Sequence, residues 1–179
     1  MCGIVGYIGQ KNTTEILLNG LKELEYRGYD SAGIALLENK NIKIFKAVGK
    51  IKNLEEKINN SSALGTDGLP SVENAEKSTT GIGHTRWATH GKPTESNAHP
   101  HMGEYSYVVH NGIIENYKEL KSELESAGHK FLSQTDTEVI VHLFEYYNNK
   151  LQDTKAAFNN TIKRLQGAYS ILLITKEES

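Results

Sequence analysis

The sequence predicts one α+β domain in which neighbouring strands pair as antiparallel hairpins. A chain of 179 residues suits one compact domain that buries roughly 70% of its unfolded surface. Its 37% hydrophobic and 23% charged residues exclude a disordered chain, and no apolar run is long enough to cross a bilayer. Two strand-like runs, Ser31–Leu37 and Ile42–Ala47, flank the polar turn Glu38–Asn41. Such local pairing favours α+β layering over a doubly wound parallel sheet.

The spacing of apolar residues predicts the elements of the first half. Gly3–Ile8 is an apolar run typical of a short strand. Leu17, Leu21 and Leu24 share one face of a helix that Thr13 or Thr14 can cap. The expected elements are a strand at 3–8, a helix from 13 or 14 to about 26, a loop at 27–30, strands at 31–37 and 42–47, and a short helix at 51–58. The polar stretch 59–80 lacks periodicity, so we expect a surface loop there.

The same analysis places strands and helices alternately in the second half. Asn116, with Glu119 at the capping-box spacing, is expected to begin a helix that Gly128 ends. The other expected elements are strands at 81–84, 105–110 and 130–132, helices around 139–147 and 158–165, and a final buried strand, Ala168–Thr175. Phe158, Ile162 and Leu165 form the predicted apolar face of the last helix, which Gly167 closes.

Charge balance and cysteine content exclude several classes of protein. Twenty Lys and Arg against 22 Asp and Glu give a net charge of −2, so no basic surface for nucleic acid or an anionic membrane is expected. One cysteine excludes an intrachain disulfide framework and a multi-cysteine zinc site. The N-terminus lacks the pattern of a signal peptide, which makes the cytoplasm the expected compartment.

The single cysteine, Cys2, directly follows the initiator methionine. Removal of Met1 would leave Cys2 with a free α-amine, whose pKa of about 7.7–8.0 lets it act as a base near neutral pH. A thiol nucleophile and its base would then belong to one residue. The alternative is an ordinary small buried residue near the chain start. Position alone leaves both interpretations open.

Two further segments carry groups suited to attack on an amide. The predicted strand 105–110 leads into Asn111 and Gly112, whose side-chain and backbone N–H groups could stabilise an oxyanion; the alternative is a plain Asn-Gly turn. The segment His84–Gly91 contains Arg86, able to hold a carboxylate, and Trp87, able to shield a site from water. Its alternative is a polar rim over a hydrophobic corner.

Two further motifs, a histidine pair and a segment with an aspartate, are less specific indications of function. His99 and His101 are two residues apart without a nearby carboxylate or thiolate, a weak metal signal. We therefore expect no metal and no cofactor. Asp136, within Gln134–Glu138, is typical of the start of a helix, and spacing alone does not show a role in binding a substrate ammonium.

Taken together, five segments closely resemble one family, the N-terminal glutaminase domains of the glutamine–fructose-6-phosphate aminotransferases. These domains are class II glutamine amidotransferases. The motifs are distributed along most of the chain outside 59–80, and the Arg-Trp-Ala-Thr-His-Gly form favours this family over related purine and asparagine enzymes. The segments are Cys2–Gly6, Leu24–Gly33, His84–Gly91, His110–Tyr117 and Thr135–Val139.

The resemblance implies an N-terminal-nucleophile hydrolase fold, a four-layer αββα sandwich of two antiparallel sheets between helices. It also implies that Cys2 attacks the side-chain amide of glutamine while Asn111 and Gly112 form the oxyanion hole. Arg86 would hold the glutamine carboxylate and Asp136 its α-ammonium.

The resemblance assigns the remaining site residues to the pocket walls. Thr89 and His90 would line the pocket, Trp87 would belong to a gating element, and Arg27 and His99 would support the site. Glutamine is then the expected small-molecule partner. Fructose 6-phosphate would be reached only through a sugar isomerase domain, which this sequence lacks, and a homo-oligomer is expected only for a full-length enzyme.

The chain departs from the family pattern in two ways. The stretch 59–80 looks like an inserted loop, and the sequence stops at Ser179, before further strands that the family pattern includes. We therefore expect residues 1–179 to form an incomplete, C-terminally truncated glutaminase domain with an open sheet edge. Two hypotheses remain: a catalytically intact glutaminase module, and a non-catalytic remnant that keeps a glutamine pocket.

Overall fold

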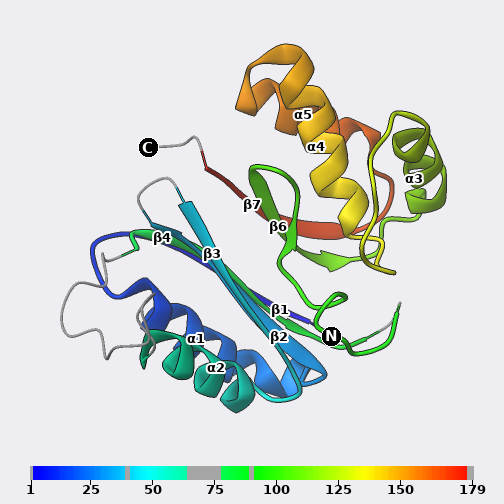
Figure 1. Ribbon diagram of the computed structural model, residues 1–179. Helices are drawn as coiled ribbons and strands as arrows, with labels where there is room; N and C mark the ends of the chain where they lie inside the picture. Colours follow the sequence, from blue (N-terminus) through cyan, green and yellow to red (C-terminus); the bar gives the residue numbers. More distant parts are fainter. Residues whose placement is uncertain (1, 39–40, 64–77, 89–90, 177–179) are drawn as a thin grey trace.

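The computed structural model describes residues 2–38, 41–63, 78–88 and 91–176. These residues form four layers, with two antiparallel sheets facing each other and helices covering the outer face of each sheet (Figure 1). The predicted αββα sandwich is therefore confirmed. Helices α1 and α2 lie under one sheet, and α3, α4 and α5 lie over the other.

The first sheet has the strand order β1-β4-β2-β3, and all of its pairs are antiparallel. Leu17, Leu21 and Leu54 are fully buried between this sheet and its helices. The predicted apolar stripe of the first helix is thus its packing face. The elements are β1 (Gly3–Ile8), α1 (Thr13–Leu24), a 3-10 turn (Glu25–Arg27), β2 (Ser31–Glu38), β3 (Asn41–Val48), α2 (Ile51–Ala63) and β4 (Thr80–Arg86).

The second sheet has the order β5-β6-β7, and β6 pairs with both neighbours in antiparallel fashion. Helix α4 contributes the largest share of the core between this sheet and its helices, including Val139, Ile140 and Leu143, which are fully buried. The elements are β5 (His101–Met102), β6 (Ser106–Gly112), α3 (Tyr117–Ser126), α4 (Glu138–Leu151), α5 (Thr154–Arg164) and β7 (Tyr169–Thr175).

A third apolar cluster joins the two sheets face to face. Ala35 and Ile82 come from the first sheet, and Tyr107 and Val109 come from the second. Because side chains alternate along a strand, Tyr107, Val109 and Asn111 all point into the sandwich, whereas Val108 and His110 face the helical layer. This alternation sends Asn111 toward the N-terminus of β1.

Three sequence predictions on the central and later segments are corrected. Residues 59–63 are not loop but the end of α2, where the Ser61 hydroxyl donates to the Lys57 carbonyl oxygen over 2.8 Å; β4 already begins at Thr80, and 64–77 lie outside the described residues. Residues 130–132 are not a strand, because the Leu132 N–H donates to the Glu138 carboxylate instead of to a strand. Asn116 precedes α3 without capping it, and its amide binds the backbone of Arg164 and Gln166.

The last helix and strand are less buried than predicted. Helix α5 buries Ala157 and Thr161, whereas Ile162 is 37% exposed. Leu165 is buried as predicted, although it lies just beyond the helix end. Strand β7 is half-buried over most of its length. Among the described strands it pairs only with β6, so it is the outer strand of its sheet.

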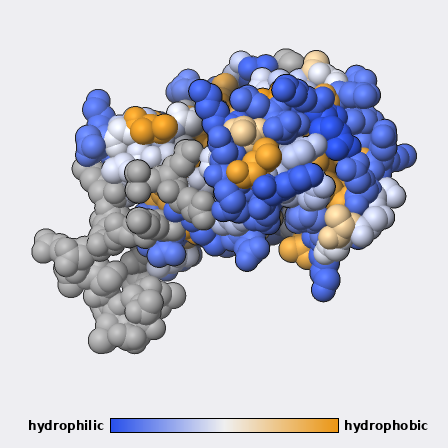
Figure 2. Space-filling view, turned by 90° about the horizontal axis from the view of Figure 1, so that it is seen from above, coloured by the Kyte–Doolittle hydropathy of each residue, from blue (hydrophilic) through white to orange (hydrophobic). Residues whose placement is uncertain are grey.

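Seen from above, the surface is mostly hydrophilic, with small separate hydrophobic areas (Figure 2). None of the helices that the structure describes is long and apolar enough to cross a membrane.

Candidate active site

Pairing of β1 with β4 places Cys2 beside Trp87. Gly3 is opposite Thr85 in the register, and its N–H donates to the Thr85 hydroxyl over 3.1 Å. Immediately past this pair, the Trp87 N–H donates to the Cys2 Sγ over 3.2 Å. The thiol is half-buried and free of any disulfide. A sulfur that accepts a backbone N–H and borders solvent is suitably placed to act as a nucleophile.

Asn111, near the end of β6, connects the second sheet to Cys2. Its side-chain Nδ2 donates to the Cys2 carbonyl oxygen over 3.1 Å. Gly112 follows with a φ of 126°, and a Cβ built there would lie 2.2 Å from the Ala168 carbonyl oxygen. Only glycine fits this backbone. The Asn-Gly pair is thus not a tight turn joining two strands; it lies beside the thiol as the last part of β6.

Arg86 and Trp87 continue β4 past the nucleophile. Arg86 is 4% exposed, and its guanidinium donates to the carbonyl oxygens of Gly91 and Lys92 over 3.3 Å each. Burial lowers the pKa of Arg86, while the nearby Cys2, Asp30 and Asp136 raise it; the group stays charged. Trp87 is 44% exposed and packs edge-on against Tyr29, with ring centroids 5.6 Å apart. Thr89 and His90, both predicted to line the pocket, lie outside the described residues.

Asp136 is buried, and its carboxylate accepts the Ile114 N–H over 2.8 Å. As expected, the segment with Asp136 lies at the start of a helix, since Thr137 is the N-cap residue of α4. The Asp136 carboxylate, however, binds the segment after β6 and not the first turn of α4. This bond ties Asp136 to the Asn111–Gly112 region.

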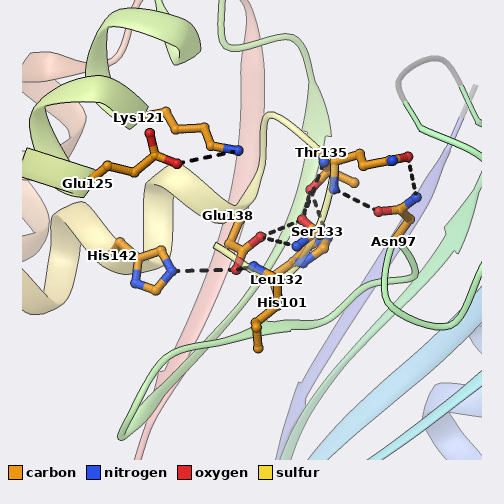
Figure 3. A network of polar contacts seen from close by, with 10 residues as sticks. Asn97, His101, Lys121, Glu125, Leu132, Ser133, Thr135, Glu138 and His142 are labelled. Atoms are coloured by element: carbon orange, nitrogen blue, oxygen red, sulfur yellow. Dashed lines mark hydrogen bonds and ion pairs between the residues drawn. The ribbon is translucent and has the colours of Figure 1, made fainter. Parts of the chain in front are cut away.

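A network of polar contacts fixes the segment that carries Asp136 (Figure 3). The Glu138 carboxylate accepts the N–H groups of Leu132 and Ser133, each over 2.7 Å, and the Ser133 hydroxyl over 2.6 Å. From the opposite side, the Asn97 Oδ1 accepts the Gln134 N–H over 2.8 Å. Burial would raise the pKa of Glu138, but hydrogen bonds from His142, Ser133 and the backbone lower it to about 2. The carboxylate therefore remains an acceptor, and the segment is held from two sides.

Four buried histidines lie behind the site, contributed by β4, the segment before β5, β5 itself and β6. They are His84, His99, His101 and His110. The rings of His84 and His99 stack with centroids 3.9 Å apart. Gly33, paired with His84, allows this, since a Cβ at Gly33 would lie 2.1 Å from the His99 carbonyl oxygen. Burial lowers the pKa of all four rings, that of His84 to about 3, so they are neutral at neutral pH.

The ring nitrogens of His99 are occupied by protein hydrogen bonds. Its Nδ1 accepts the His110 N–H over 3.3 Å, and its Nε2 lies 3.2 Å from the Thr137 hydroxyl. His101 Nε2 similarly lies 3.1 Å from the Thr135 hydroxyl. Among the described residues no group of three or more His, Cys, Asp or Glu side chains could hold a metal ion. His99 thus braces the loop before α4.

Two cavities meet at the nucleophile, and Cys2, Trp87 and Gly112 line both. The smaller, of about 30 Å³, also contains Arg86 and Asp136 on its walls. The larger, of about 730 Å³, opens beside Cys2 next to Arg27, Asn111 and other residues. The thiol therefore lies between a small charged pocket and a wide groove. The described residues among the predicted site residues, Arg27 and His99 included, all line one of these two cavities.

Several residues that shape the site were not predicted. Asp30 accepts the Ala88 N–H through its carboxylate over 2.7 Å and fixes the chain after Trp87. Thr137 bridges the rings of His99 and His110. Asn97 braces the Asp136 segment. Each depends on contacts between distant segments, so no local spacing in the sequence indicated it.

A model of the glutamine amidotransferase domain matches residues 84–179, which include the end of β4, Asn111, Gly112 and Asp136. The chain belongs to the glutamine amidotransferase family. That match covers more than half of the chain, and the β1–β4 pairing adds Cys2 to the same site.

Relatives in this family match almost the whole chain. It is 57% identical to a glutamine–fructose-6-phosphate aminotransferase (isomerizing) of Campylobacter jejuni and 52% identical to one of Helicobacter pylori, covering 99% and 98% of this chain. In each case the match spans 28% of the relative's length and corresponds to its N-terminal glutaminase domain. The resemblance seen in the sequence is therefore confirmed.

Solved structures of this class share the fold. A glutamine phosphoribosylpyrophosphate amidotransferase from B. subtilis matches with a TM-score of 0.76, and an allosteric regulatory enzyme of purine biosynthesis with a TM-score of 0.79. Both are 27% identical, and each match covers 98% of this chain and 35% or 36% of the other. This glutamine amidotransferase domain is therefore similar to the matching part of both enzymes.

Proposed function

We propose that this glutamine amidotransferase domain hydrolyses the side-chain amide of glutamine to glutamate and ammonia, with Cys2 as the nucleophile. The observation that carries the proposal is the location of the single thiol, between a cavity walled by Arg86 and Asp136 and the side chain of Asn111. Opposite charges at one end of a pocket suit the carboxylate and ammonium of an amino acid. A nucleophile and amide donors at the other end suit attack on a carbonyl.

The reaction follows from these groups. With Met1 removed, the Cys2 amine accepts the thiol proton as Sγ bonds to the amide carbon of glutamine. The carbonyl oxygen becomes an oxyanion that the Gly112 N–H and the second hydrogen of the Asn111 amide stabilise. The amine then returns the proton to the leaving nitrogen, the C–N bond breaks, and ammonia departs. Water hydrolyses the resulting thioester, which releases glutamate and restores the thiol.

The other pocket residues have supporting roles in this proposal. Arg86 binds the α-carboxylate and Asp136 the α-ammonium, while Trp87, Thr89 and His90 enclose the substrate. Arg27 supports the wall of the larger cavity, and His99 supports the wall of the smaller one. The exposed Trp87 side chain lines both cavities and acts in this proposal as the gating element where glutamine enters.

We further propose that the ammonia serves amination of fructose 6-phosphate in a longer synthase, as the names of the relatives suggest. Because the chain spans 28% of those relatives, residues 1–179 by themselves are expected to make no glucosamine 6-phosphate. The sugar phosphate is then a partner of the longer enzyme, and a homo-oligomer would belong to it too. A free thiol nucleophile favours a reducing compartment, so we propose the cytoplasm.

A glutaminase assay on the purified chain, processed so that Cys2 is N-terminal, tests the proposed function. We expect release of glutamate and ammonia from glutamine, and none from the Cys2→Ala protein. The assay is run with and without a separately supplied C-terminal part of a synthase. If the folded chain binds glutamine but hydrolyses none in either case, the non-catalytic remnant becomes the better description.

A further inference from the structure

A buried contact between His84 and Asn111 lies directly behind the candidate oxyanion site. The His84 Nε2 lies 3.0 Å from the Asn111 Oδ1 and 3.1 Å from the His110 carbonyl oxygen. Both oxygens only accept hydrogen bonds. The hydrogen of the neutral ring must therefore reside on Nε2, which donates to both oxygens. The Nδ1, which is buried and has no hydrogen-bond partner among the described residues, is the unprotonated nitrogen.

This donor determines which way the Asn111 amide faces. Exchanging its oxygen and nitrogen would bring the Nδ2 hydrogens against the Nε2 hydrogen of His84 and bring Oδ1 against the Cys2 carbonyl oxygen. Both contacts are repulsive. In the observed orientation Oδ1 accepts from His84 and Nδ2 donates to Cys2 over 3.1 Å. One of the two Nδ2 hydrogens remains for a substrate oxygen.

His84 is itself held firmly. It is 1% exposed, lies within β4 opposite Gly33 in the register, and stacks on His99 at 3.9 Å and 19° between ring planes. Burial lowers the pKa of His84 to about 3, although its hydrogen bond to Asn111 raises it. The ring therefore stays in one neutral tautomer across the pH range in which a thiol nucleophile works.

We propose that His84 is a positioning residue that fixes the Asn111 amide with its nitrogen toward Cys2, so that it can stabilise the oxyanion. The inference rests on the proposed function, since Asn111 has an oxyanion to stabilise only if glutamine is hydrolysed. A donor displaced by about 1 Å can lower a rate by about 10²-fold. Losing His84 should thus act on kcat through Asn111.

The test compares His84→Leu with His84→Gln. The Gln amide nitrogen can take the place of Nε2, whereas Leu offers no donor. We expect His84→Leu to lower kcat for glutamine hydrolysis by roughly 10- to 100-fold with little change in KM. His84→Gln should regain most of that loss, and His129→Gln, a half-exposed histidine outside the site, should leave kcat unchanged. Equal losses in the Leu and Gln variants would overturn the proposal.

A double-mutant comparison separates positioning from general damage to the fold. In an Asn111→Ala background, His84→Leu should lower kcat by less than about threefold, because the amide that His84 orients is gone. A full additional loss would show that His84 acts elsewhere. If the wild-type chain hydrolyses glutamine but His84→Leu is as active, the positioning role fails while the proposed function stands.

A spectroscopic readout works even without turnover. In ¹⁵N-labelled protein, the Asn111 side-chain NH₂ pair is the one missing from Asn111→Ala. We expect this pair to shift or broaden in His84→Leu and to remain near its wild-type position in His84→Gln. An unchanged pair in His84→Leu would overturn the inference. Absence of glutamine hydrolysis by the wild-type chain would instead count against the proposed function.

Discussion

The Trp87 N–H donates to the Cys2 Sγ over 3.2 Å. The two residues are 85 positions apart in sequence, and the antiparallel pairing of β1 with β4 brings them together. The same strand end presents the Arg86 side chain to the adjacent cavity. The thiol and the proposed carboxylate-binding group are therefore fixed relative to each other by one strand pair, which is more rigid than a loop would be.

Replacing Cys2 with Ala should abolish glutamine hydrolysis, because the chain has no other thiol and the adjacent donors cannot form the thioester. Rates of glutamate release from matched wild-type and Cys2→Ala preparations measure this. Glutamine binding, followed by calorimetry, should persist in Cys2→Ala, since Arg86 and Asp136 remain.

Residues left in front of Cys2 should abolish hydrolysis too, because an acylated nitrogen has no free pair to accept the thiol proton. The comparison is between the processed chain and one with an uncleaved N-terminal tag, and removal of the tag by a protease should restore the rate. Full activity in the tagged protein would contradict the role of the α-amine as base.

Arg86→Ala should raise the KM for glutamine, or lower kcat/KM, by about two orders of magnitude or more, since an unpaired, partly desolvated carboxylate costs ~2–5 kcal/mol. Asp136→Asn is a second variant that perturbs the fold less, because the amide oxygen can still accept the Ile114 N–H while the negative charge is lost. Glu119→Gln, an exposed carboxylate on α3, is the control. Steady-state kinetics decide, and an unchanged kcat/KM in Arg86→Ala would remove Arg86 from the site.

Asn111→Ala should lower kcat by about 10²–10³-fold, because removing one oxyanion donor costs ~2.7–4 kcal/mol of transition-state stabilisation. The variant also removes the bond to the Cys2 carbonyl oxygen, so a thermal unfolding curve must accompany the kinetics. Glutamine should still bind. Weaker glutamine binding with an unchanged kcat would mean that Asn111 binds the substrate in its ground state and does not stabilise the transition state.

Much of this fold follows from local sequence patterns. The hairpin β2–β3 was predicted from two apolar runs around a polar turn, and its register joins Ser31 with Val48 and Glu38 with Asn41. The leucines of α1 indicated its buried face. The strand predicted at 130–132 is wrong, because the Leu132 N–H donates to the side chain of Glu138, six residues away, and not to a neighbouring strand.

The candidate site is less accessible to such reasoning. Cys2 and the Asn111–Gly112 pair stood out by position and residue type, and both line the groove that was found. The proposed role of Asp136 came from the family resemblance alone. In the structure its carboxylate binds the Ile114 N–H from another segment, a contact that local spacing does not reveal. The contact of His84 with Asn111 joins two sheets, and spacing within one segment cannot reveal it.

Acidification should destabilise the domain well before its carboxylates protonate. The pKa of His84 is about 3 in the folded chain against an ordinary 6.5, and the pKa values of His99, His101 and His110 are lowered too. Between these values the unfolded chain binds protons that the folded chain does not. The free energy of unfolding should therefore fall as pH decreases below about 6.5, by up to about 1.4 kcal/mol per pH unit for each histidine.

Urea denaturation at pH 8, 6.5 and 5 measures this effect. Glu138, with a folded pKa of about 2 against 4.5, adds to the loss only below about pH 4.5, so the change between pH 6.5 and 5 reports on the histidines. In His84→Gln, the difference in the free energy of unfolding between pH 6.5 and 5 should be smaller by the contribution of one histidine. A free energy of unfolding that is flat from pH 6.5 to 5 would show that the rings accept protons inside the fold.

The final prediction concerns the outer edge of β7. Among the described strands it pairs only with β6, and its residues Tyr169–Thr175 include no charged side chain. Apolar hollows of about 330 and 470 Å³ adjoin it, one toward Gly6 and Ile82 and one toward Phe158. An uncharged outer strand with apolar surface on both faces favours pairing with another chain. We expect concentration-dependent association of residues 1–179, measured by light scattering.

Strand β3, the outer strand at one edge of the other sheet, is the internal control. Lys43 and Lys46 lie along it, and charged side chains oppose edge-to-edge pairing. Hydrogen exchange at low protein concentration should show fast-exchanging amides in both strands. Raising the concentration should protect β7 amides and leave those of β3 unchanged. A monomer at all concentrations, with slow exchange throughout Tyr169–Thr175, would show that β7 needs no neighbour beyond β6 and that the domain closes this edge itself.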